Sequence, residues 1–82
     1  MREFKLVIVK PEKTVFDEMA VYCDFVTSEG KMGVKALHEP FMAVLANDTK
    51  FLYRTINGQE NALEAINAIV TFKNNICTVV MS

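Results

Sequence analysis

Short apolar runs with a two-residue period, separated by turn-forming residues, are the feature that most constrains the fold of this chain. Such runs are typical of β-strands with one buried face, and here they recur about every 8 to 12 residues. Turn signals lie between them at Pro11, at Asn57-Gly58 and at Asn74-Asn75. The sequence therefore predicts an all-β fold, a two-sheet β-sandwich of many short strands.

The pattern is clearest in Phe4–Val9, Val21–Val26, Phe41–Ala46, Lys50–Ile56 and Ile76–Val80. In most of these segments side chains alternate so that one face is apolar, and Val21, Cys23 and Phe25 are expected on one such face. Phe41–Ala46 is instead an unbroken apolar run, for which we expect burial on both faces. Asn57-Gly58 predicts a type I′ hairpin turn because both residues tolerate positive φ.

The stretch Val15–Ala20 is compatible with a helix or a strand. Thr14 could cap a helix, and Phe16 and Ala20 lie four positions apart, as on one helical face. The segment that follows, Val21–Val26, alternates with a two-residue period. We therefore expect Val15–Ala20 to be extended as well.

The stretch Asn61–Val70 is also ambiguous. It is rich in helix-forming residues, and Leu63, Ile66 and Val70 fall on one helical face. An Asn-Gly pair before it and an Asn-Asn pair after it both resemble hairpin turns, which favours two short strands. If the stretch were a helix, the chain would be a small α+β ligand-binding domain instead.

Size and charge exclude several classes of function. The 82 residues are enough for one domain, spanning residues 1–82. The net charge is −1 and the basic residues are spread along the chain, so no basic stripe indicates nucleic-acid binding. The apolar runs are far shorter than the roughly 20 residues of a membrane-spanning helix, and no secretory signal is apparent. We expect a cytoplasmic protein without a membrane-inserted segment.

The sequence does not indicate catalysis, a cofactor or a metal site. Its one histidine, His38, has no Ser, Cys or Thr at a spacing that indicates a nucleophilic pair. The Gly30–Gly33 segment lacks the Gly-Lys-Ser or Gly-Lys-Thr ending of a phosphate-binding loop. Cys23 and Cys77 are far apart and lack metal-ligand spacing, so we expect buried thiols rather than a disulfide or a redox pair.

The segment Val26–Pro40 is where the chain must turn. It holds two of the three glycines, one of the two prolines and the only histidine. Both glycines can take positive φ, and the proline fixes its own φ. We expect a loop that presents Glu29, Lys31 and His38 at one end of the domain.

This pattern resembles the amino-terminal domain of the epsilon subunit of the F-type ATP synthase, which is called delta in mitochondria. The residues that carry the resemblance are Leu6, Ile8, Val9, Pro11, Phe16, Glu29–Val34 and His38–Pro40. The resemblance covers essentially the whole chain. It implies a β-sandwich that serves as a non-enzymatic central-stalk (rotor) subunit, linking the gamma subunit to the c-ring and supporting the coupling of ion-driven rotation to ATP synthesis. It also implies a peripheral location at the inner face of the cell membrane, within the synthase complex.

The resemblance implies that the loop of Val26–Pro40 faces the polar loops of the c-ring, with Glu29, Lys31 and His38 at the contact. Many relatives carry an acidic residue where Lys31 stands, which indicates a changed ring partner or a contact carried by Glu29. His38 could instead only bond to loop backbone and hold the turn. Leu37 stands where the family has glycine, and this restricts the backbone there.

A second implied surface is one face of the sandwich, which packs on gamma. Candidates for it are Met32, Phe41 and Met42, with Val26 and Leu52, although core burial is the commoner fate of such side chains.

Two departures from the family pattern affect what the resemblance implies. Asn67-Ala68 stands where relatives have a glycine pair between two strands. The sequence ends at Ser82, so we expect a domain that lacks the carboxy-terminal helical hairpin of longer epsilon subunits, without ratchet-type inhibition of ATP hydrolysis or ATP sensing. An alternative is a free-standing protein-interaction module of the same fold.

Overall fold

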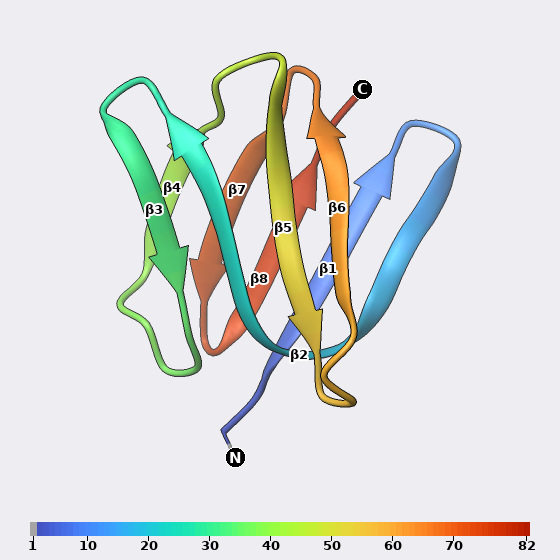
Figure 1. Cartoon of the computed structure of the whole chain (residues 1–82), viewed down its shortest axis with the longest axis vertical. Helices are drawn as coiled ribbons and strands as arrows, with labels where there is room; N and C mark the ends of the chain where they lie inside the picture. Colours follow the sequence, from blue (N-terminus) through green and yellow to red (C-terminus); the bar gives the residue numbers. More distant parts are fainter. Residues whose placement is uncertain (1) are drawn as a thin grey trace.

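The computed structural model describes residues 2–82, which form eight β-strands and no helix (Figure 1). The strands are β1 (Phe4–Lys10), β2 (Lys13–Thr27), β3 (Gly30–Val34), β4 (Phe41–Val44), β5 (Thr49–Thr55), β6 (Glu60–Ala65), β7 (Ile69–Lys73) and β8 (Ile76–Val80). The predicted all-β class is confirmed. Over the described residues, the structure contains no helix that could span a membrane.

The strands form one continuous sheet that curls into two layers. Its order is β4-β7-β8-β1-β2-β5-β6, with β3 also paired to β2. The first half of the long β2 pairs with β1, and its second half pairs with β3 and β5. We call β4-β7-β8-β1 the back layer and β3-β2-β5-β6 the front layer (Figure 1). The layers meet again where Thr27 pairs with Leu45, just after β4.

A β-bulge at Val21 marks where β2 passes from one layer to the other. Ala20 pairs with Thr55, and Tyr22 pairs with Arg54, which is the residue before Thr55 on β5. Val21 therefore has no partner on β5 and is the extra residue of the bulge. The extra residue breaks the two-residue alternation, and Ala20 and Cys23 are both fully buried although they are three positions apart. The prediction that Val21 shares the buried face of Cys23 and Phe25 is therefore wrong, since Val21 is only half-buried.

Both ambiguous stretches are strands, as predicted, and the helix alternatives are wrong. Val15–Ala20 belongs to β2, and Asn61–Val70 supplies most of β6 and the start of β7. The turn between β6 and β7 places Asn67 at a φ of 49°. Asparagine tolerates this left-handed conformation better than most residues, and the Asn67 N–H donates to Asn47 Oδ1 over 2.8 Å. Asn67 thus takes the role of the missing glycine.

The segment Phe41–Ala46 is not buried on both faces as predicted. β4 lies at one end of the sheet order, and its side chains alternate between half-buried and exposed. Met42 is 73% exposed and Val44 66% exposed. The unbroken apolar run therefore belongs to an edge strand with an open outer side.

The prediction of a type I′ turn at Asn57-Gly58 is also wrong. Only Gly58 has positive φ, at 83°, and its N–H donates to the carbonyl of Thr55 over 3.0 Å. The connection is a three-residue loop, Ile56 to Gly58, that ends in a left-handed glycine. Asn74-Asn75, with φ of 53° and 60°, forms the two-residue hairpin turn that was predicted.

The core lies between the layers, and its four largest fully buried side chains are phenylalanines. Phe25 stacks on Phe51 at 5.8 Å between ring centroids, and Phe4 meets Phe72 edge-on at the same distance. Cys23 and Cys77 are free and fully buried in this core, as predicted. A hydrogen bond with the Cys77 thiol and burial together raise the pKa of Cys23, so its thiol stays protonated in the folded protein.

Candidate functional site

The segment Val26–Pro40 is a hairpin followed by a loop, which corrects the expectation of a single loop. The hairpin joins β2 to β3, and Glu29 lies exposed in its turn. The Thr27 hydroxyl accepts a hydrogen bond from the Glu29 N–H over 3.1 Å and donates to the Gly30 carbonyl over 3.0 Å. Gly30 takes a φ of 124°, as predicted. We call this exposed turn, Thr27 to Gly30, the hairpin tip.

Gly33 does not have positive φ, although the sequence suggested that it could adopt such a conformation. It lies within β3, opposite Asp24 of β2. A Cβ at this position would lie 2.8 Å from the Tyr22 hydroxyl oxygen and 3.4 Å from a ring carbon. The glycine is therefore needed to make room for the Tyr22 side chain.

Lys31 forms an ion pair within the chain. Its Nζ lies 3.8 Å from Oδ1 of Asp24, whose residue is only 9% exposed. Glu29, by contrast, forms no ion pair with any residue from 2 to 82. The uncompensated charge of the hairpin tip is therefore the carboxylate of Glu29.

His38 has a structural role in the loop before β4. Its half-buried ring meets Phe41 edge-on at 5.1 Å and Phe72 at 6.0 Å, and Nδ1 lies 2.8 Å from the Glu39 carbonyl oxygen. The preceding Leu37 adopts a φ of 64°, which is rare for a residue with a branched side chain. Its N–H is held by the Asn75 side-chain oxygen at 2.8 Å.

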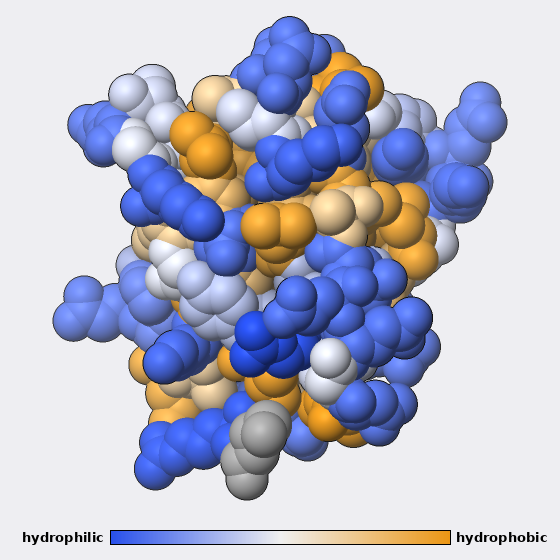
Figure 2. Space-filling model, viewed as in Figure 1, coloured by the Kyte–Doolittle hydropathy of each residue, from blue (hydrophilic) through white to orange (hydrophobic). Residues whose placement is uncertain are grey.

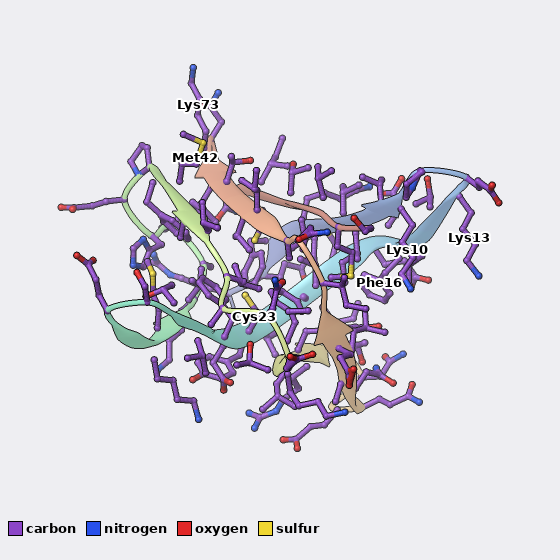
Figure 3. All side chains as sticks on the ribbon, turned by 90° about the horizontal axis from the view of Figure 1, so that it is seen from above. Lys10, Lys13, Phe16, Cys23, Met42 and Lys73 are labelled. Atoms are coloured by element: carbon purple, nitrogen blue, oxygen red, sulfur yellow. The ribbon has the colours of Figure 1, made fainter. Side chains whose placement is uncertain are left out.

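The three residues predicted to face gamma lie in different environments. Met32 and Phe41 are half-buried and pack against the core, where Phe41 stacks on Phe72. Met42 points outward, as Figure 3 shows. These three residues and Glu29 nevertheless line one hollow between the hairpin tip and β4. Lys31 and His38 do not line it.

The outer side of the back layer carries an apolar surface that was not predicted from the sequence. Val44, Ile69 and Val80 form one cross-strand row on β4, β7 and β8, with Val9 of β1 as its continuation. The exposed large apolar side chains on this side are Met42, Val44, Ile69, Ile76 and Val80, with exposures from 42% to 73%. We call these five residues the apolar face. Aligned exposed apolar side chains of this kind mark interaction surfaces.

The outer side of the front layer is different. Figure 2 shows that side, over β2, β3, β5 and β6, as mainly hydrophilic with scattered apolar residues. Ion pairs cross it between neighbouring strands, from Lys50 to Glu64 at 3.9 Å and from Arg54 to Glu60 at 2.6 Å. The back layer also carries an ion pair on its outer side, from Lys5 to Asp17 at 2.8 Å, but most of the exposed large apolar side chains of the described strands lie on that layer.

Only part of the signal for the apolar face was present in the sequence. Ile76, Thr78 and Val80 alternate with the buried Cys77 and Val79, and they lie on the outer side of β8. The alternation was not recognised in β4, which was expected to be buried on both faces, or at Ile69, which lies in a helix-like stretch.

Among the residues described, no three or more His, Cys, Asp and Glu side chains are grouped to hold a metal ion.

Comparisons with known proteins agree on one family. The family model of the ATP synthase delta/epsilon chain beta-sandwich domain matches residues 3–82. The sodium-ion-specific ATP synthase epsilon chain of Propionigenium modestum is 43% identical over 60 residues, which are 73% of this chain and 43% of that protein.

Solved structures show the same fold. A chain in the mitochondrial ATP synthase OSCP/F1/c-ring structure of Euglena gracilis superposes with a TM-score of 0.88 at 17% identity, covering 96% of this chain and 50% of that one. A chain in the central stalk/c-ring structure of the Tetrahymena thermophila mitochondrial enzyme gives a TM-score of 0.75 at 12% identity, covering 98% and 63%. The chain thus spans about half the length of the relatives it matches.

Proposed function

The chain belongs to the family of the ATP synthase delta/epsilon chain beta-sandwich domain, and from this premise we propose that it is a non-enzymatic component of the central stalk of an F-type ATP synthase. In this role it links the gamma subunit to the c-ring, so that ion-driven rotation is coupled to ATP synthesis. A close-packed two-layer body suits this task because tightly packed interiors deform little under load. The proposed location is the cytoplasmic side of the membrane, as a peripheral part of the complex.

The apolar face carries this proposal, and its occupant is the gamma subunit. Val44, Ile69 and Val80 of this face are paired across three neighbouring strands, so they form a continuous row rather than isolated residues. Burying such a surface against a partner contributes about 25 cal/mol per Å² of apolar area removed from water. Of the residues predicted to face gamma, Met42 belongs to this face, while Met32 and Phe41 lie in the adjoining hollow.

The hairpin tip is the proposed contact with the polar loops of the c-ring. Glu29 is exposed and unpaired within the described residues, whereas the charge of Lys31 is balanced by Asp24. We therefore assign the charged part of this contact to Glu29, which requires a basic group on the ring loop. His38 lies beyond the opposite end of β3, in the loop before β4, so we assign it no part in this contact.

Co-purification with gamma tests the proposal. The chain and the gamma subunit of the same organism are co-expressed, and the chain carries Ile69→Glu on the apolar face or Leu52→Glu on the front layer. Both positions are exposed apolar residues on strands, at 42% and 38% exposure. Leu52 was a candidate for the gamma-facing surface, but it lies on β5, in the other layer from Met42, so Leu52→Glu is a matched control. We expect Ile69→Glu to abolish co-purification and Leu52→Glu to leave it unchanged.

Thermal unfolding of both variants shows whether each still folds. If the folded Ile69→Glu variant retained gamma as well as the unaltered chain did, the assignment of the apolar face would be wrong. If the unaltered chain did not bind gamma at all, the proposed function itself would be refuted.

A further inference from the structure

The outer side of the front layer carries a hollow whose charged lining is entirely basic. It is lined by Arg2, Val21, Tyr22, Lys35, Ala36 and Arg54. Tyr22 pairs with Arg54 across β2 and β5, and the register that pairs Cys23 with Val34 places Lys35 on the opposite flank of Tyr22. Neighbouring strands lie about 4.8 Å apart, so both cationic side chains reach the space over the tyrosine ring. We call this site the basic hollow.

Two of the three basic side chains of the basic hollow have no acidic partner among residues 2–82. No carboxylate of residues 2–82 lies within ion-pair distance of Arg2 or Lys35. Asp24 and Glu60 line an adjoining hollow that shares Tyr22 and Arg54 with the basic hollow, and each is paired with a basic side chain. Two unpaired cations therefore converge on one site of a chain whose net charge is −1.

Arg54 is oriented at the edge of the basic hollow by an exposed ion pair and by the Tyr22 ring. Its Nε and Nη2 both donate to Oε2 of Glu60, over 3.0 and 2.6 Å, and its guanidinium carbon lies 6.0 Å from the centre of the Tyr22 ring. Nη1 donates to no other residue of the described chain. A guanidinium oriented in this way loses little conformational freedom when it binds a ligand.

We propose that the basic hollow binds a phosphoryl group, supplied either by free inorganic phosphate or by the headgroup of an anionic lipid. Guanidinium and ammonium groups are the side chains that recognise phosphate oxygens, and Arg54 supplies a preoriented N–H while Arg2 and Lys35 supply charge. The basic hollow lies on the front layer, away from the apolar face. Phosphate binding at this site can therefore be tested independently of gamma binding.

Titration of the labelled chain with sodium phosphate, followed by NMR amide shifts at constant ionic strength, tests the site. We expect saturable shifts at residues of the basic hollow. The double variant Arg2→Ala/Lys35→Ala should weaken binding about tenfold, because each exposed charge contact contributes a few-fold. The control Lys13→Ala/Lys73→Ala removes the same charge from two other exposed positions and should change binding less than about twofold.

Sedimentation with phosphatidylcholine vesicles, with or without phosphatidylglycerol, distinguishes the two sources. Binding to the anionic vesicles that is lost in Arg2→Ala/Lys35→Ala but kept in the control identifies a lipid headgroup. Binding of inorganic phosphate without vesicle binding identifies a soluble ligand. The proposal is overturned if neither probe binds, or if the control variant weakens binding as much as the basic-hollow variant does.

Discussion

Gly30 and Gly33 belong to the same short sequence pattern but are required for different reasons. Gly30 has a φ of 124° and no atom within 4 Å of the place where a Cβ would lie, so it is needed for its backbone conformation. Gly33 has an ordinary strand conformation, and a Cβ there would clash with Tyr22. A sequence alone cannot separate these roles, because the partner of Gly33 is brought to it by strand pairing.

The substitution Gly33→Ala should lower the free energy of unfolding by about 1 kcal/mol, since it forces the Tyr22 ring to move. The clash is mainly with the tyrosine hydroxyl, because the nearest ring carbons lie at 3.4 and 3.5 Å. In a Tyr22→Phe background the same substitution should therefore be neutral or slightly stabilising, as alanine is a better strand residue than glycine. Chemical denaturation of the four proteins of this double-mutant cycle measures the difference.

An equal loss of stability in both backgrounds would contradict the role assigned to Gly33. It would mean that the substitution disturbs the backbone of β3 rather than the tyrosine.

Among the turns, the β7–β8 turn connects three segments of the chain. The Asn75 side chain accepts a hydrogen bond from Leu37 N–H over 2.8 Å and donates to the Glu3 carbonyl over 3.0 Å. It therefore ties the start of the chain and the loop before β4 to this turn. The bond to Leu37 also helps to hold a left-handed conformation that costs about 1 to 2 kcal/mol in a residue with a side chain.

Replacing Asn75 by glycine should lower the free energy of unfolding by about 1 kcal/mol, although glycine suits the positive φ of the turn. The loss comes from the two side-chain hydrogen bonds. Asn74→Gly is the matched control, because Asn74 has a similar φ of 53° and makes neither bond. Thermal and chemical unfolding should show no loss for Asn74→Gly, and comparable losses for both would show that the turn itself, rather than the tie, is responsible.

Much of the element order could be predicted because β-strands leave a local, two-residue signal. β1, β5 and β8 were expected close to their observed bounds, and flanking turns correctly overruled the helix-like stretch before β7. The errors came where the pairing partner decides the outcome. The bulge at Val21 depends on β5, and the exposure of β4 depends on its place at the end of the sheet.

At the scale of the whole molecule, five of the six large apolar side chains that are exposed on the described strands lie on the back layer, and this arrangement carries the functional proposal. The sequence pointed to Glu29 and Met42, since the family resemblance implied a ring-facing loop with Glu29 and a gamma-facing surface with Met42. It could not reveal the apolar face as a surface, because its five residues come from three strands that become neighbours only in the fold. The basic hollow was missed for the same reason.

The folded protein should lose stability at alkaline pH. The hydrogen bond with Cys77 and burial raise the pKa of Cys23, and burial raises the pKa of Tyr53. Both groups ionise more readily in the unfolded chain, so stability is fully present below their ordinary pKa values and falls as the pH rises through and above them. Each group contributes a slope of up to about 1.4 kcal/mol per pH unit.

Urea unfolding at intervals between pH 7 and pH 11 measures this slope. The Cys23→Ala variant should be less stable at pH 7 because of the cavity it leaves, but its stability should fall less steeply above pH 9. An unchanged slope would show that the Cys23 thiol does not titrate on unfolding as the structure requires.

Site-specific photo-crosslinking in the assembled synthase tests the account most directly. A photoreactive amino acid is placed at Val44 on the apolar face, at Glu29 on the hairpin tip or at Leu52 on the front layer, and the crosslinked partners are identified by mass spectrometry. The account predicts crosslinks from position 44 to gamma, from position 29 to the c-ring, and to neither from position 52. Crosslinks to gamma from position 52 but not from position 44 would contradict it.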